Sequence, residues 1–156
     1  MCAIIDPPIM TSLFSETDQH HSDFAPLKRW LLSKFGKIIV GGTKYKKELS
    51  FMRSVLGVLA EFERSGKILR VPDSEVDAEV EILLKIYGGK DFDDPHLVAL
   101  VRLTKCRIVC LRDVRARRHL LDVKFYGGSA KLRPKLYTRA RNSNLLCERN
   151  VALYCK

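Results

Sequence analysis

The amino-acid sequence predicts an α/β fold, in which one central, mainly parallel sheet is flanked by helices. Short apolar runs alternate along the chain with stretches of helical period. Whole helices, and not tight turns, separate these runs, as the crossover connections between parallel strands require. At 156 residues the chain is long enough for one domain with its own core. No internal repeat or low-complexity linker divides it, so we expect a single domain over residues 1–156.

Local signals place each element in order. Apolar runs predict strands over residues 2–5, 38–40, 68–71 and 107–111. Helical period between start and stop residues predicts helices over residues 9–14, 23–34, 43–65, 73–87 and 94–101. Thr43 is the expected N-cap of the third helix, and Gly88-Gly89 the expected end of the fourth.

The last part of the chain has weaker signals. Residues 120–126 and 135–138 are compatible with strands, and residues 150–155 are ambiguous. We therefore expect a core over residues 1–126, and a basic C-terminal segment over residues 127–156 that packs on the sheet or extends it.

Positive charge is concentrated in one region. The formal net charge is +10, and residues 102–141 alone hold thirteen Lys or Arg against two Asp. Such a patch favours binding of a polyanion through phosphate contacts and counterion release, so nucleic acid is the expected partner. A basic face that only keeps the protein in solution, or an acidic protein partner, is the alternative.

The sequence also bears on location. It has no apolar stretch of membrane-spanning length, and its first residues lack the basic region of a signal peptide, so we expect a soluble, cytoplasmic protein without a membrane partner. Its five cysteines include no C-x-x-C pair and no zinc-finger spacing, which favours reduced, structural thiols.

Acidic residues stand where a parallel sheet places its ligands. Asp6 and Asp113 each follow a predicted strand, Asp94 begins a predicted helix, and Glu48 lies one or two turns into another. Ligands of such sheets bind beyond the carboxyl ends of the strands, so these four carboxylates are expected to meet. Carboxylates held together are hard to keep ionised without a hard cation, which implies Mg²⁺ or Mn²⁺ and metal-assisted cleavage of a phosphodiester.

Each acid taken singly also has an ordinary explanation. Asp94 could simply cap a helix, and Glu48 could pair with Lys44 on a solvated face. Asp93 is an additional candidate ligand beside Asp94. His96 could contact phosphate or transfer a proton, although histidines at such positions are more often structural.

Several ordered segments resemble one known family. They are Ile4-Ile5-Asp6, Gly41-Gly42-Thr43-Lys44 with Glu48-Leu49, Val71-Pro72-Asp73 with Val76-Asp77-Ala78-Glu79-Val80, Asp93-Asp94-Pro95-His96 with Ala99, and Cys110 to Asp113. In this order and spacing the set resembles PIN domains, including the VapC-type ribonucleases and the small stand-alone bacterial PIN proteins.

The resemblance implies a PIN-like domain that cleaves single-stranded or structured RNA and leaves 5′-phosphate and 3′-hydroxyl ends. It implies that Asp6, Glu48, Asp94 and Asp113 are both the catalytic and the metal-binding residues. It also allows the role of a toxin held by an acidic antitoxin or inhibitor protein, and a homodimer. The RNA substrate, the cleavage sequence, the choice between Mg²⁺ and Mn²⁺ and the oligomeric state are left open.

Two departures from the family pattern keep an alternative function open. Pro8 stands two positions after the first Asp, where a small polar residue is usual, and Leu111 stands two before the last, where Ser or Thr is frequent. Lost hydrogen bonds around the metal would give a catalytically impaired module that binds RNA or a protein without cutting.

Basic residues near the predicted acids are the candidate phosphate contacts. They are Lys44, Arg112, Arg115, Arg117 and Arg118. The same arginines could instead dock an acidic inhibitor segment.

Overall fold

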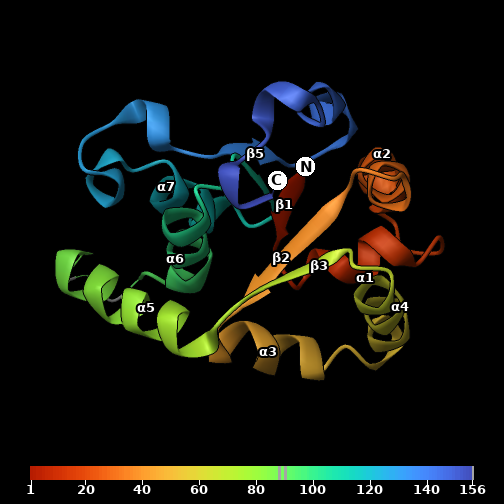
Figure 1. The fold of residues 1–156 in the computed structure, drawn as a ribbon, viewed down its shortest axis with the longest axis horizontal. Coiled ribbons are helices and arrows are strands. Elements are labelled where there is room, and N and C mark those ends of the chain that lie inside the picture. Colours follow the sequence, from red (N-terminus) through yellow and green to blue (C-terminus); the bar gives the residue numbers. More distant parts are fainter. Residues whose placement is uncertain (88, 90, 156) are drawn as a thin grey trace.

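The apolar runs of the sequence form one parallel sheet. The computed structural model describes residues 1–87, 89 and 91–155, and in this part the strands are Cys2–Ile5 (β1), Lys37–Gly41 (β2), Ile68–Val71 (β3), Ile108–Cys110 (β4) and Lys135–Tyr137 (β5). Their order in the sheet is β3-β2-β1-β4-β5, and every pair is parallel. The predicted α/β class with a parallel sheet flanked by helices is confirmed (Figure 1).

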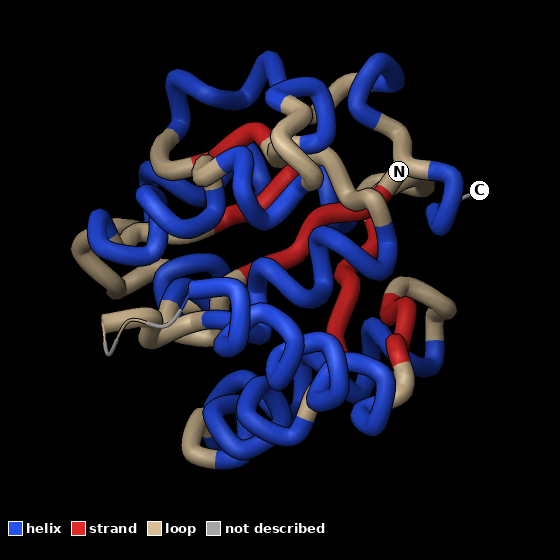
Figure 2. Tube along the Cα trace, turned by 90° about the vertical axis from the view of Figure 1, so that its left-hand side faces the viewer, coloured by secondary structure: helices blue, strands red, loops and turns tan. Residues whose placement is uncertain are grey.

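Helices cover both faces of this sheet. They are Ile9–Phe14 (α1), His21–Leu32 (α2), Thr43–Ser50 (α3), Arg53–Arg64 (α4), Asp73–Tyr87 (α5), Pro95–Thr104 (α6) and Val114–Leu120 (α7). Figure 1 shows α1, α2 and α4 on one side of the sheet and α5, α6 and α7 on the other. Figure 2 shows the strands running through the middle of the molecule between these layers. The core is therefore the sheet itself together with the inner faces of the helices.

The central strand defines where a ligand site should lie. All residues of β1 are buried, as expected for a parallel strand covered on both faces. Its neighbours are β2 on one side and β4 on the other, with Ile4 opposite both Ile39 and Val109. The strand order runs outward from β1 in both directions, so the carboxyl ends of β1 and β4 flank a topological switch point. Asp6 and Asp113 follow these two ends.

The C-terminal segment contributes one strand, β5, at the edge of the sheet. β5 comes from residues 127–156 and pairs with β4. The remainder forms short 3₁₀ helices, which are Ala130–Leu132 (η2), Ala140–Leu145 (η3), Glu148–Asn150 (η4) and Leu153–Cys155 (η5). The predicted strand over 135–138 is confirmed, whereas the predicted strand over 120–126 is wrong. Those residues end α7 and form the 3₁₀ helix Val123–Tyr126 (η1), which buries Phe125 and Tyr126.

Two other local predictions need correction. The helix expected over 43–65 is two helices, since Phe51 ends α3 and Met52, with φ −99° and ψ 63°, begins α4. This break turns α4 toward α1, where Phe62 packs edge-on against Phe14. The N-cap of α3 is Gly42 and not Thr43. Gly88, at the expected end of α5, lies outside the described residues.

The two ends of the chain lie side by side (Figure 1). A disulfide joins Cys2 to Cys155, with Cα atoms 5.7 Å apart, so the expectation of reduced thiols is wrong for this pair. Cys106, Cys110 and Cys147 are free. Among the described residues, no helix is both long enough and apolar enough to cross a membrane.

Candidate metal centre

Asp6 is held at the carboxyl end of the central strand. Its backbone N–H donates to the carbonyl of Cys110 at 2.9 Å, which extends the pairing of β1 with β4 by one residue. Only 4% of Asp6 is exposed. The hydroxyl of Tyr45, on α3, donates to the carbonyl of Ile5 at 2.5 Å. This bond ties α3 to the end of β1 and so brings Glu48, one turn after Tyr45, toward Asp6.

The start of α3 is fixed by α5. Gly42 has φ +91°, a conformation that side chains rarely adopt, and its N–H donates to Asp73 at 3.0 Å. Asp77 accepts from the N–H and from the hydroxyl of Thr43, at 3.0 and 2.6 Å. Because the first turn of a helix leaves N–H groups unpaired, these two carboxylates cap α3 from outside. The position of Glu48 therefore depends on Asp73 and Asp77. In the sequence, the resemblance to PIN domains was what drew attention to these two acids.

Asp94 and Asp113 occupy the first positions of two helices in different ways. Asp94 precedes α6, but within the described part of the chain its side chain makes no capping hydrogen bond. Its Oδ1 instead accepts from Lys44 Nζ at 3.1 Å. Asp113 does cap α7, since it accepts from the N–H of Arg115 at 2.7 Å and pairs with that guanidinium at 3.2 Å. The capping role weighed for Asp94 is thus not what its carboxylate does.

All four predicted acids line one cavity. Its volume is about 380 Å³. The lining residues are Asp6, Pro8, Ile9, Glu48, Asp94, Arg112 and Asp113. The cavity therefore combines carboxylates from four separate elements with one guanidinium and a small apolar wall.

Two carboxylates of this cavity, Asp6 and Glu48, have a raised pKa. Burial raises the pKa of Asp6 to about 7, and the charges of Asp94, Glu48 and Asp113 add to this effect. Burial also raises the pKa of Glu48, against the lowering effect of the Lys44 charge. By contrast, hydrogen bonds from Arg115 lower the pKa of Asp113. Such mutual repulsion is relieved when a divalent cation binds between the carboxylates.

His96 is a further buried group beside these acids. It lies on α6 with 1% exposure, and neither ring nitrogen has a hydrogen-bond partner among the described residues. Its Nε2 lies 3.8 Å from Glu48 Oε2. Burial lowers the pKa of His96 to about 4, which keeps the imidazole neutral at physiological pH. The signal in the sequence was the spacing Asp94-x-His96 at the start of a buried helix.

Glu48, Asp94 and His96 together fit a metal ion. One ligand atom from each lies within 4.8 Å of the other two. Two carboxylate oxygens and a neutral, unpartnered imidazole nitrogen are common ligands of divalent cations. Asp6 faces the same cavity, and Asp113 lies across it. The residues present are thus compatible with the cation that the sequence implied.

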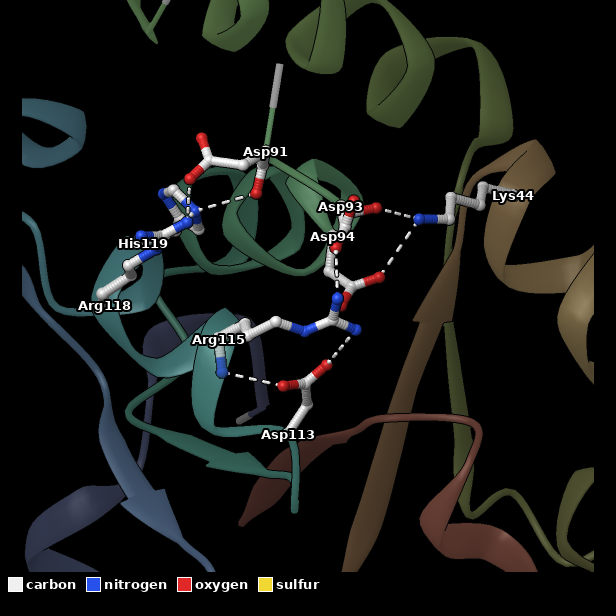
Figure 3. A network of polar contacts seen from close by, with 8 residues as sticks. All are labelled: Lys44, Asp91, Asp93, Asp94, Asp113, Arg115, Arg118 and His119. Atoms are coloured by element: carbon white, nitrogen blue, oxygen red, sulfur yellow. Dashed lines mark hydrogen bonds and ion pairs between the residues drawn. The ribbon is translucent and has the colours of Figure 1, made fainter. Parts of the chain in front are cut away.

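Two of the five predicted basic contacts, Lys44 and Arg115, pair with acids of this site (Figure 3). Lys44 Nζ contacts Asp94 at 3.1 Å, Glu48 at 3.8 Å and the backbone carbonyl of Asp93. Arg115 bridges Asp113 and the side chain of Asp93, the latter at 3.4 Å. The Asp93 carboxylate thus pairs with a guanidinium and, like Asp6 and Asp113, is not one of the three residues whose ligand atoms lie within 4.8 Å of one another.

The other predicted arginines lie around this network. Arg118 pairs with Asp91 beside the buried ring of His119 (Figure 3). Arg117 donates to the backbone carbonyl of Arg112 at 3.1 Å. Of the predicted arginines, Arg112 is the one that lines the cavity directly.

The fold and the site define an α/β domain with a carboxylate-lined cavity at the carboxyl ends of a parallel sheet. No protein-family model matches the chain, and no curated protein matches its sequence. The resemblance to PIN domains therefore remains a prediction made from the residues.

Proposed function

We propose that this protein is a PIN-like, metal-dependent endoribonuclease that uses Mg²⁺ or Mn²⁺. The single observation that carries the proposal is the cavity in which Asp6, Glu48, Asp94 and Asp113 meet at the switch point of the sheet. A cavity that gathers four acids raises the free energy of the protein by itself, as the raised pKa of Asp6 indicates. A function that brings in a cation accounts for this cost.

The residues of the cavity have separable tasks in this proposal. Asp6, Glu48 and Asp94 would hold the cation, which supplies charge neutralisation and a more acidic water molecule when bound. Asp113, kept ionised by Arg115, provides a further negative group on the opposite wall. Arg112 is placed to bind a phosphate group at the cavity, because its guanidinium matches two phosphate oxygens.

The basic region supports RNA as the substrate. Residues 102–141 carry thirteen Lys or Arg, and α7, which follows Asp113, holds three of them. A chain that enters the cavity would meet these cations on either side of the cleaved bond, which lowers the free energy of a bound polyanion. A cytoplasmic location, an acidic antitoxin or inhibitor protein and a homodimer belong to the same proposal.

A second candidate function is a binding module without activity. Pro8 is in the cavity wall, where it offers no hydrogen-bond donor to a ligand or carboxylate. Lys44 already neutralises part of the charge of Glu48 and Asp94. Both observations favour a site that binds RNA or a protein and does not cut.

The test is cleavage of a labelled single-stranded RNA with Mn²⁺, Mg²⁺ or EDTA. The Asp6→Asn, Asp94→Asn double variant is compared with a matched Glu75→Gln, Glu81→Gln double variant, whose two acids are exposed on α5 and away from the cavity. We expect metal-dependent cleavage by the wild type and the control, and none by the first variant. Salt-sensitive RNA binding without cleavage by any of the three proteins would support the binding module instead.

A further inference from the structure

The starting observation is a buried imidazole with no partner. His96 is 1% exposed, and both ring nitrogens lack a hydrogen bond to any described residue. Leaving a buried polar group unpaired raises the free energy of the folded protein, so such groups are rare without a function. The nearest aromatic ring is that of Tyr45, 6.1 Å away and nearly perpendicular, and its hydroxyl is bonded elsewhere.

A second buried histidine in the same protein shows the usual arrangement. His119 is 4% exposed, and its Nε2 lies 3.2 Å from Arg118 Nε and 3.3 Å from the carbonyl of Asp91. The protein therefore supplies polar neighbours to one buried imidazole and leaves the other facing the carboxylate of Glu48. The difference indicates that the partner of His96 is not among the described residues.

The geometry around His96 is close to that of a coordinated ion. With metal–ligand bonds of ~2.1 Å, neighbouring ligand atoms lie ~3 Å apart and opposite ones ~4.2 Å apart. The distance from His96 Nε2 to Glu48 Oε2 is 3.8 Å, and the whole set with Asp94 spans at most 4.8 Å. The Glu48 side chain is 29% exposed, so it has room to move its carboxylate closer to His96 Nε2.

A cation already lies beside these carboxylates. The ammonium of Lys44 is 3.1 Å from Asp94 and 3.8 Å from Glu48. Its side chain is 45% exposed and flexible, so it can move into solvent when a metal ion binds. The charge of the site is thus suited to a cation, and the unpartnered nitrogen adds a ligand that an ammonium cannot use.

We infer that His96 is a nitrogen ligand, and that Glu48, Asp94 and His96 form a mixed site that binds Mn²⁺ or a similar transition ion in preference to Mg²⁺. Imidazole is a common ligand of transition ions, whereas Mg²⁺ in proteins is bound mainly by carboxylates, phosphates and water. The inference rests on the proposed function, because Glu48 and Asp94 line the cavity of that function, and it deepens the function by naming the ligand set and the class of metal.

The decisive measurement is pulsed electron paramagnetic resonance on untagged full-length protein loaded with Mn²⁺ in a buffer without nitrogen ligands. We expect modulation from a directly bound ¹⁴N nucleus, replaced by a ¹⁵N coupling when the protein is labelled with ¹⁵N-histidine. His96→Phe and His96→Gln should abolish the coupling. A matched His119→Gln variant should keep it. Circular dichroism shows which variants fold. The comparison of unlabelled with ¹⁵N-histidine-labelled wild-type protein tests the inference without any variant.

Metal competition provides the second measurement. We expect Mn²⁺ to displace Mg²⁺ from the wild type, and His96→Gln to weaken Mn²⁺ binding by at least ~10-fold while Mg²⁺ binding changes less. Bound Mn²⁺ without any nitrogen coupling, or an absence of Mn²⁺ binding, would overturn the inference. The proposed function fails separately, since nitrogen coupling without RNA cleavage leaves the ligand set standing, and cleavage without nitrogen coupling leaves the nuclease standing.

Discussion

Replacing Asp6 by Asn in the metal-free protein should make it more stable at alkaline pH. Asp6 is buried at the end of β1 among three other acids, and its pKa rises from the ordinary 3.8 to about 7. Above that pH the folded state holds an ionised carboxylate in a poorly solvated, negatively charged place. Asn keeps the shape of the side chain and removes the charge.

The sign and the magnitude follow from proton linkage. Between pH 3.8 and about 7 the folded protein holds a proton on Asp6 that the unfolded chain has lost, so the free energy of unfolding falls as pH rises. A difference of about three pKa units corresponds to ~4 kcal/mol at 1.36 kcal/mol per unit. Asp6→Asn should therefore gain up to ~4 kcal/mol at pH 8, which is ~10 °C in melting temperature for a domain of this size, and little at pH 4.

The assay is thermal and urea unfolding in EDTA at pH 4, 6 and 8, with the exposed Glu81→Gln as control. Adding Mn²⁺ at pH 8 should stabilise the wild type by ~2.7 kcal/mol when the free Mn²⁺ concentration is a hundred times its dissociation constant. The same addition should stabilise Asp6→Asn much less. Equal pH dependence of the wild type and Asp6→Asn would refute the reasoning, because it would mean that the ionised Asp6 carboxylate carries no cost.

Three further predictions concern other parts of the molecule. Gly42→Ala should lose ~1–3 kcal/mol in thermal unfolding, because φ is +91° and the new Cβ would lie 2.7 Å from Val76 Cγ1; an unchanged melting temperature would contradict this geometry. Arg115→Gln should lower the salt dependence of RNA binding by about one phosphate contact in fluorescence anisotropy, and an unchanged slope would show that its guanidinium serves only the neighbouring acids. Cys155→Ser should lose ~2–4 kcal/mol in non-reducing buffer and nothing in dithiothreitol, because the bond to Cys2 closes a loop over a sequence separation of 153; equal losses in both buffers would argue against the disulfide.

The sheet could be predicted because its strands carry a local signal. Each of the four strands predicted in residues 1–111 is a mainly apolar run with a stop at its end. The burial of β1, β2 and β4 follows from such runs alone, whereas β3, at the edge of the sheet, is partly exposed. The proximity of Asp6 and Asp113 follows from the same apolar runs, since the parallel strands β1 and β4 end at the same edge of the sheet. The placement of Asp94 and Glu48 beside these two acids could be predicted only by assuming short connections between strands and helices, and from the resemblance to PIN domains.

What could not be predicted depends on contacts between distant residues. The break between α3 and α4 accompanies the packing of Phe62 on Phe14, 48 positions earlier in the chain, and such a distant contact has no local signal. Residues 120–126 have the apolar content of a strand, but Asp122 caps a 3₁₀ turn there by accepting from the N–H of Lys124. The lack of a partner for His96 is a property of its whole surroundings, and no sequence pattern reports it.

Lys44 shows why the two interpretations of Glu48 are not exclusive. The ordinary explanation was a salt bridge with Lys44 on a solvated face, and the functional one was a metal ligand. The structure contains the salt bridge, at 3.8 Å, but on the wall of the acidic cavity and shared with Asp94. An acidic site without its metal still needs positive charge nearby, and the Lys44 charge acts to lower the pKa of both Asp6 and Glu48. The salt bridge therefore fits an empty metal site as well as a site that does not cut, and it does not decide between the two functions.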